Sequence, residues 1–294
     1  MQGYIVYNGF WNTNDIPDPV KRLSKAAVAR GHQLEPRPNL DFAVHIKNGA
    51  LTIPGVHQGD VVLCWDKDVR LYKAMEKSGA HLYNDSKSVA VCDDKSATHL
   101  ALSGKGIPMP ETFVAPMTYV EYGQEGFSFL ENASGTLGFP LVFKECFGSL
   151  GEQVYLIENK QQLLDKAKQM HHRPFLLQKY IRESSGNDKR LYVVGNEVVA
   201  AMKRHSYTDF RANIGSGGTG TAYTPTKEEV TIALSCCEIL GLQFGGVDLL
   251  DSNEGPLVCE VNASAHMAAL TKCTGVDIAD KIIQFVEKME ESSC

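Results

Sequence analysis

The sequence lacks any apolar run approaching the roughly 20 residues that a membrane-spanning helix needs. Its first residues open directly into a strand pattern, without the basic start of a secretory signal peptide. Eight cysteines are present, but none forms a C-x-x-C pair, so their spacing favours neither a zinc site nor a disulfide framework. These absences predict a cytoplasmic protein with no membrane partner, whose cysteines are small buried apolar residues.

A positive charge balance and several well-known enzyme motifs are also missing. The formal net charge of −6 argues against a general nucleic-acid binder. No G-x-G-x-x-G follows the first strand, so a dinucleotide is not expected there. There is no nucleophile elbow, which makes hydrolysis through an acyl-enzyme unexpected.

The 294 residues suffice for two or three packed units. Strand and helix patterns alternate over the first 85 residues, which predicts a small α/β domain. Breaks near residue 90 and after residue 181 divide the chain into units 1–90, 91–182 and 183–294. Within the second unit, the stretch 122–138 is rich in Gly, Ser and Asn and is expected to be mobile.

A C-terminal hairpin over residues 244–262 carries an acidic pair. Centring it on Glu254 places Asp248 opposite Glu260, with Asn262 on the same face. The other face, which includes Cys259, is apolar and is expected to lie against a core. Opposed carboxylates repel unless a cation lies between them, and three oxygen donors suit Mg²⁺ or Mn²⁺. The alternative is an ordinary amphipathic hairpin with solvated acids.

Basic residues accompany this hairpin. Lys144 ends a strand and is followed by a glycine loop, Gly148 to Gly151, which suits phosphate binding but equally fits a plain hairpin. No G-K-[ST] follows, so the loop is not a P-loop. Further basic residues flank the loop before the acidic hairpin and suit a site for polyanions, or are simply solvated charges: Arg190, Lys203, Arg204 and Arg211.

Seven such motifs occur in one order, and together they resemble the ATP-grasp superfamily, within it the RimK-like carboxylate–amine ligases. They are D-K at 94–95, the lysine and glycine loop at 144–151, Q-x-Y-I at 178–181, D-x-R at 188–190, F-R-x-N at 210–213, G-V-D-L-L at 246–250 and E-V-N-A-S at 260–264. The resemblance implies an ATP-grasp fold behind an N-terminal pre-ATP-grasp α/β domain, with two α+β lobes that hold ATP.

The resemblance also implies roles for individual residues. Lys95 and Lys144 match the lysines on the ATP phosphates, and Asp188 matches the acidic residue on the ribose. The implied nucleotide contacts are completed by Gly148, Ser149 and Gly151 of the lid loop, by Gln178, Lys179, Tyr180 and Ile181 at the adenine, and by Lys203 and Asn213. The implied metal ligands are Asp248, Glu260 and Asn262, and the implied catalytic residues are Lys144, Arg190 and Arg211.

The implied reaction uses ATP and Mg²⁺ (or Mn²⁺) to convert a carboxylate to an acyl phosphate, which an amine then attacks to form an amide. The substrates are expected to be small molecules or peptides, and assembly as a homo-oligomer is left open. Two departures from the family pattern, Ser216 and Ala265-His266, leave the substrates undefined. His266 is a candidate for the acceptor site, with a structural role as the alternative. Two other functions stay open: a carboxylate kinase or ATPase, and a non-catalytic nucleotide-binding module.

Overall fold

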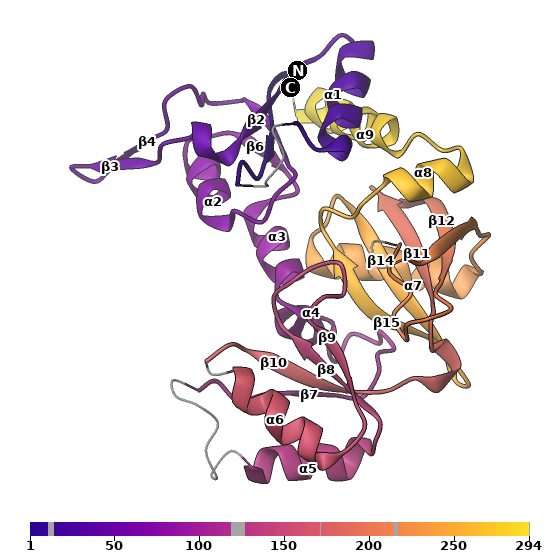
Figure 1. The fold of residues 1–294 in the computed structure, drawn as a ribbon. Helices are drawn as coiled ribbons and strands as arrows, with labels where there is room; N and C mark the ends of the chain where they lie inside the picture. The colour runs from indigo at the N-terminus through magenta and orange to yellow at the C-terminus, as the bar shows by residue number, and fades with distance from the viewer. Residues whose placement is uncertain (11–14, 119–126, 171, 215–216, 294) are drawn as a thin grey trace.

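The computed structural model describes residues 1–294 except 11–14, 119–126, 171, 215–216 and 294. Three main sheets follow one another along the chain, and Figure 1 shows them as an indigo to purple unit, a magenta unit and an orange to yellow unit. None of the helices in the described part of the chain combines the length and the hydropathy that crossing a bilayer requires.

The first sheet is four-stranded and parallel, with the order β2-β1-β5-β6. This confirms the α/β prediction for the start of the chain. Its central strands are apolar on both faces, as expected for strands covered by helices. The elements are β1 (Gln2–Tyr7), α1 (Asp18–Ala29), β2 (Gln33–Pro38), the short η1 (Asn39–Asp41), the hairpin β3 (His45–Lys47) and β4 (Ala50–Thr52), β5 (Val61–Cys64), α2 (Val69–Lys77) and β6 (His81–Tyr83).

Two short helices lead into the second sheet, which is antiparallel with the order β7-β10-β8-β9. Helix α4 begins at Lys95 because the Asp94 side chain accepts hydrogen bonds from the backbone of Ser96 and Ala97. The elements are α3 (Ser86–Asp93), α4 (Lys95–Leu102), β7 (Thr112–Val114), α5 (Phe127–Leu137), β8 (Leu141–Glu145), β9 (Val154–Ile157), α6 (Lys160–Met170) and β10 (Phe175–Lys179).

The mobile stretch expected at 122–138 is in large part helix α5. Its apolar residues Leu130, Ala133 and Leu137 recur at helical spacing and are buried. Packing of this face outweighs the weak helix propensity of Gly135 and its polar neighbours. Residues 122–126 of the stretch lie outside the described residues.

The third sheet is five-stranded and antiparallel, with the order β13-β12-β11-β14-β15. Thr226 and Glu229 form a capping box by bonding reciprocally at the start of α7, and Gly241 ends that helix in the left-handed conformation. The elements are η3 (Arg182–Ser184), β11 (Asn187–Val194), β12 (Glu197–His205), β13 (Thr219–Ala222), α7 (Lys227–Leu240), β14 (Phe244–Ser252), β15 (Gly255–Asn262), α8 (Ala268–Thr274) and α9 (Ile278–Ser293).

The last helix returns the chain to its beginning. Figure 1 shows α9 beside α1, and Arg30 binds Asp280 and Glu287 of α9. Buried side chains of the first and third sheets form shared clusters, whereas the second sheet has a core of its own. The division at residues 90 and 182 therefore stays a proposal.

Candidate functional site

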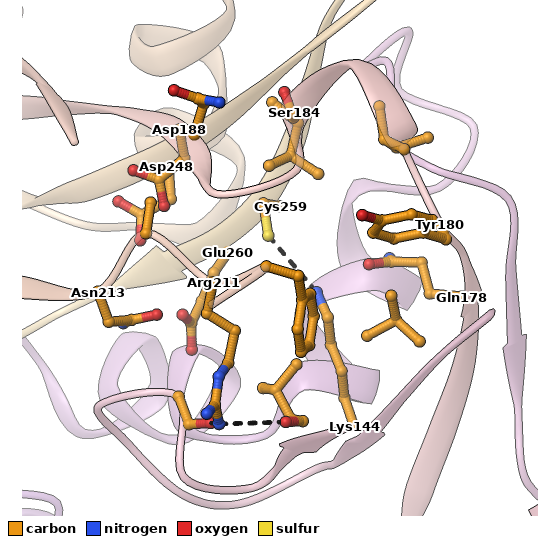
Figure 2. Close-up of a pocket in the computed structure, with 18 of the residues that line it drawn as sticks. Lys144, Gln178, Tyr180, Ser184, Asp188, Arg211, Asn213, Asp248, Cys259 and Glu260 are labelled. Carbon is orange, nitrogen blue, oxygen red and sulfur yellow. Dashed lines mark hydrogen bonds between the residues drawn. The ribbon is translucent and has the colours of Figure 1, made fainter. Parts of the chain in front are cut away.

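A pocket lies between the second and third sheets (Figure 2), and Ser149 and Gly151 of the loop from β8 to β9 form part of its wall. The residues that line it come from α4, β8, β9, β10, η3, β11, β12, β14, β15, the loop from β8 to β9 and the loop at 210–213. It brings together most of the residues predicted as a site: Lys95, Lys144, Ser149, Gly151, Gln178, Lys179, Tyr180, Ile181, Asp188, Arg211, Asn213, Asp248 and Glu260.

The two ends of the pocket differ in charge. Gln178 and Tyr180 lie on one side in Figure 2, near the apolar residues Val142 and Ile181. Carboxylates from the third sheet lie on the other side, among them Asp248. This separation provides an uncharged end that can take a flat ring and a charged end that can take a polyanion with cations.

Lys95 and Lys144 are both buried and reach the middle of the pocket from different elements. Lys95 Nζ lies 3.3 Å from Glu260 Oε1 and 3.5 Å from the carbonyl oxygen of Gly148. Lys144 Nζ lies 3.5 Å from Cys259 Sγ, which is a weak acceptor. A buried ammonium without a carboxylate partner favours an anionic ligand.

The acidic pair is positioned by the hairpin of β14 and β15. Asp248 pairs with Glu260 as predicted, but the turn and the register of the hairpin differ from those predicted. The turn is centred between Asn253 and Glu254, and a β-bulge next to Asp248 restores the register. The bulge turns Cys259 into the pocket, so the prediction that this residue belongs to the apolar face of the hairpin is wrong.

Asp248 is almost fully buried and is held by two guanidinium groups. Arg190 donates to both of its carboxylate oxygens at 2.7 Å, and Arg204 donates to Oδ2 at 2.9 Å. Burial opposes ionisation, but Arg190 and Arg204 outweigh it and hold the pKa of Asp248 below its ordinary value. Asp248 is therefore an anion in the protein at neutral pH, as a metal ligand must be.

The residues present fit a divalent cation. Asp248 and Glu260 line the pocket side by side. Asp248 Oδ2 is occupied by two guanidinium groups, but Asp248 Oδ1 accepts a single hydrogen bond and Glu260 is approached by Lys95 alone among the described residues, so both carboxylates keep lone pairs for a cation. Asn262 follows Glu260 on β15, and its buried Nδ2 atom has no partner among the described residues. Its amide oxygen is a ligand type that hard cations accept. Asn262 does not itself line the pocket.

Arg211 joins the loop over the pocket to the third sheet. Its Nη1 donates to the carbonyl oxygens of Gly151 and Val154, while Nε and Nη2 bind Asp209. Asn213 Oδ1 lies beside Gly151, close enough that a Cβ on that glycine would come within 2.8 Å of it. Arg211 and Asn213 thus hold the loop from below.

Four predicted residues lie away from the pocket surface. Gly148 is in the loop from β8 to β9 but does not line the pocket, and Asn262 was described above. Arg190 lies behind Asp248 and bonds to it, so it acts on the site through that carboxylate. Lys203 is exposed on the opposite face of the sheet, with Nζ 4.7 Å from the ring centre of Tyr223.

Arg204, the neighbour of Lys203, lines the pocket instead of Lys203. Counting from the Gly195-Asn196 turn would place Lys203 opposite Asp188, but a bulge between β11 and β12 adds one residue, and Arg204 pairs with Asp188 instead. Arg204 binds both oxygens of Asp188, the shorter bond at 2.5 Å. Burial raises the pKa of Asp188 despite this partner.

Other pocket residues were not predicted: Ser184, Asn187, Phe210 and Leu250. Phe210 and Leu250 lie within the F-R-x-N and G-V-D-L-L motifs but were given no role, whereas no motif marks Ser184 or Asn187. His266 is exposed on the loop after β15 and does not line the pocket, and Ser216 lies outside the described residues.

Residues 92–286 match the model of the RimK-like ATP-grasp domain. The chain is 34% identical over 284 residues to a probable alpha-L-glutamate ligase 2 of Shewanella denitrificans, and 34% identical over 282 residues to the ribosomal protein bS6–L-glutamate ligase of Escherichia coli. Each alignment covers 91% of both chains. A solved RimK domain ATP-grasp protein of Sphaerobacter thermophilus has the same fold, with a TM-score of 0.72 at 22% identity over 96% of this chain and 98% of that one.

A fold and pocket of this kind define an ATP-grasp enzyme, an ATP-dependent ligase. The chain belongs to the RimK-like ATP-grasp family. The predicted fold class and the predicted enzyme class are both confirmed.

Proposed function

We propose that the protein joins the carboxylate of an amino acid or peptide to an amine, and that it does so in this pocket. The observation that carries the proposal is the meeting of Lys95, Lys144 and the opposed acids Asp248 and Glu260 in one pocket. Buried cations next to paired carboxylates suit a nucleoside triphosphate with its metal ions, and they suit little else.

In the proposed reaction, the substrate carboxylate attacks the γ-phosphorus of ATP and ADP leaves. The amine then attacks the acyl carbon, and phosphate is released as the amide forms. Lys95, Lys144 and Arg211 would bind phosphate oxygens and offset the charge that develops on them. The loop from β8 to β9, tied down by Arg211, would keep water from the acyl phosphate.

Asp248, Glu260 and Asn262 would hold the divalent cation. When bound, such an ion would neutralise negative charge on the phosphate groups. Arg190 would keep Asp248 ionised and correctly oriented without touching the nucleotide.

The finer choice of substrate rests on the relatives. Two of them are named as glutamate ligases, and the bS6 ligase is named for a protein substrate. We therefore propose an amino acid, glutamate first among them, as one substrate. The compartment, proposed as the cytoplasm, and assembly as a homo-oligomer are left to experiment.

The first test measures ADP release with ATP, Mg²⁺ and a panel of amino acids and small peptides, and seeks the amide product by mass spectrometry. We expect Lys144→Ala and Glu260→Gln to lower ADP release at least about 100-fold, because each removes charge stabilisation from the transferred group. Matched controls are Lys105→Ala, an exposed lysine outside the pocket, and Glu254→Gln, an exposed acid at the tip of the same hairpin. Both controls should release ADP at the wild-type rate.

Wild-type ADP release by Lys144→Ala or Glu260→Gln would refute the site. Substrate-dependent ADP release without an amide would instead point to a carboxylate kinase or ATPase. Absence of nucleotide binding by the wild-type protein would refute the whole proposal.

A further inference from the structure

A buried hydrogen-bonded chain lies behind the uncharged end of the pocket. His99 of α4 and Gln178 of β10 are 6% and 2% exposed, and Thr112 of β7 is half-buried beside them. Gln178 Nε2 lies 2.9 Å from His99 Nε2 and 3.0 Å from Thr112 Oγ1. The chain ends on two backbone carbonyls: His99 Nδ1 lies 2.9 Å from the oxygen of Lys95, and Thr112 Oγ1 lies 2.7 Å from that of Pro110.

The two carbonyls fix the direction of every hydrogen bond between them, because a carbonyl oxygen can only accept. His99 must carry its proton on Nδ1 to donate to Lys95. Burial, and then the nearby Lys144, lower the pKa of His99 to about 4, so the ring is neutral at pH 7 and its Nε2 accepts. The Thr112 hydroxyl donates its hydrogen to the carbonyl oxygen of Pro110. Its oxygen is therefore an acceptor for Gln178 Nε2.

Both protons of the Gln178 amide are therefore used, one on His99 and one on Thr112. In the reverse orientation, Gln178 Oε1 would face two acceptors and the amide would be repelled from both sides. The Oε1 atom receives no hydrogen bond from any described residue, and Gln178 lines the pocket between Val142 and Tyr180. An amide oxygen that opens onto the pocket without a donor from the protein is left for a ligand.

We propose that His99 and Thr112 are positioning residues that lock Gln178 as an acceptor, so that the pocket selects a nucleobase with an exocyclic amino group, such as adenine, over one with an oxo group at that position. This inference rests on the proposed function, because it takes the uncharged end of the pocket as the base site. The amino group donates a hydrogen bond to Gln178 Oε1. An oxo group at the same position is itself an acceptor, so neither it nor Gln178 Oε1 gains a hydrogen bond.

The first experiment needs no mutation. It measures the Kd of the wild-type protein, with Mg²⁺, for ATP, for purine riboside triphosphate (which lacks the amino group) and for inosine triphosphate (which has an oxo group). We expect about 10-fold weaker binding of the first analogue and about 100-fold weaker binding of the second, relative to ATP. Equal binding of all three would overturn the inference and leave the proposed function standing. Failure to bind even ATP would overturn the proposed function.

The second experiment frees the amide. His99→Phe and Thr112→Val each remove one anchor, after which the Gln178 amide can turn and present its nitrogen to the base. We expect the preference for ATP over inosine triphosphate to fall from about 100-fold to below about 10-fold. The matched control is Thr98→Val, which removes a buried hydroxyl that bonds to Val91 and Asp94, outside this chain.

A residue with a merely structural role would weaken both nucleotides in parallel and leave their ratio unchanged. That outcome in folded His99→Phe and Thr112→Val proteins would overturn the positioning role. If His99→Phe does not fold, Thr112→Val and the wild-type analogue series decide the question.

Discussion

His99 makes the stability of the protein depend on pH between about 4 and 6.5. Its pKa of about 4 in the folded protein lies below the ordinary histidine value of about 6.5. As the pH falls through this window, the unfolded chain binds a proton that the folded protein excludes, so the free energy of unfolding decreases. We expect His99 to lower it by about 2 kcal/mol between pH 7.5 and pH 5.

Urea unfolding of wild-type and His99→Phe proteins at both pH values measures this contribution. Other groups titrate in both proteins, so the difference between their pH dependences isolates His99. The wild-type protein should lose about 2 kcal/mol more than the variant. Equal losses would mean that His99 titrates with its ordinary pKa in the folded protein, and that burial does not keep the ring neutral at pH 5.

Individual residues are also where the sequence misled us. Lys203 and Arg204 are adjacent, and only the register of β12 decides which of them faces Asp188. The alternation of side chains between the two faces of a strand can be predicted from sequence. A bulge shifts this alternation by one residue, and no sequence pattern indicates where it occurs. The same cause brought Cys259 into the pocket. His99 was missed because a single buried histidine carries no spacing signal.

The loop between β8 and β9 depends on a conformation that only glycine adopts easily. Gly151 has φ of +76°, and a Cβ there would lie 2.8 Å from Asn213 Oδ1. We expect Gly151→Ala to displace the loop from Arg211 and Asn213 and to lower kcat/KM for ATP at least about 10-fold. Steady-state ADP release measures the effect.

Gly104→Ala is the matched control for this loop. Gly104 has φ of +70°, but no atom lies within 4 Å of the position of its Cβ. It therefore has the same backbone strain without a collision, and its kcat/KM should stay near that of the wild type. If both variants lose activity equally, backbone strain alone explains the loss and the contact with Asn213 is irrelevant.

Elements with strong local signals were predicted well. The α/β order of the first residues and the acidic hairpin both follow from short-range sequence patterns. Helix α5 was missed because the composition of its polar face suggests a loop, whereas its buried face is stabilised by packing against residues of β8 and β10. Tertiary packing, which the local sequence does not contain, decides such cases.

At the scale of the whole molecule, the order of motifs predicted the family, but not how the units pack. The sequence suggested three separate units, whereas the first and third sheets share buried clusters and α9 docks on α1. Contacts between residues 250 positions apart, such as Arg30 with Asp280, are not readable from one sequence. The second sheet, by contrast, reaches the rest of the protein mainly through α4 and the pocket walls.

This arrangement predicts that nucleotide binding stabilises the molecule as a whole. Lys144 and Gln178 belong to the second sheet, and Asp248 and Glu260 belong to the third, so a ligand in the pocket joins the two. At a concentration about 100 times its Kd, such a ligand adds about 2.7 kcal/mol to the free energy of unfolding. For a chain of this size we expect ATP with Mg²⁺ to raise the Tm by about 5 °C or more.

Differential scanning calorimetry tests this with three proteins. The wild type and Glu254→Gln should show the full rise and a single transition, because the joined sheets unfold together. Lys144→Ala should show a much smaller rise at the same nucleotide concentration, because one of the two sheets loses its contact with the phosphates. A rise in Lys144→Ala equal to that of the wild type would place the nucleotide elsewhere, since a ligand outside this pocket would not depend on a lysine buried within it.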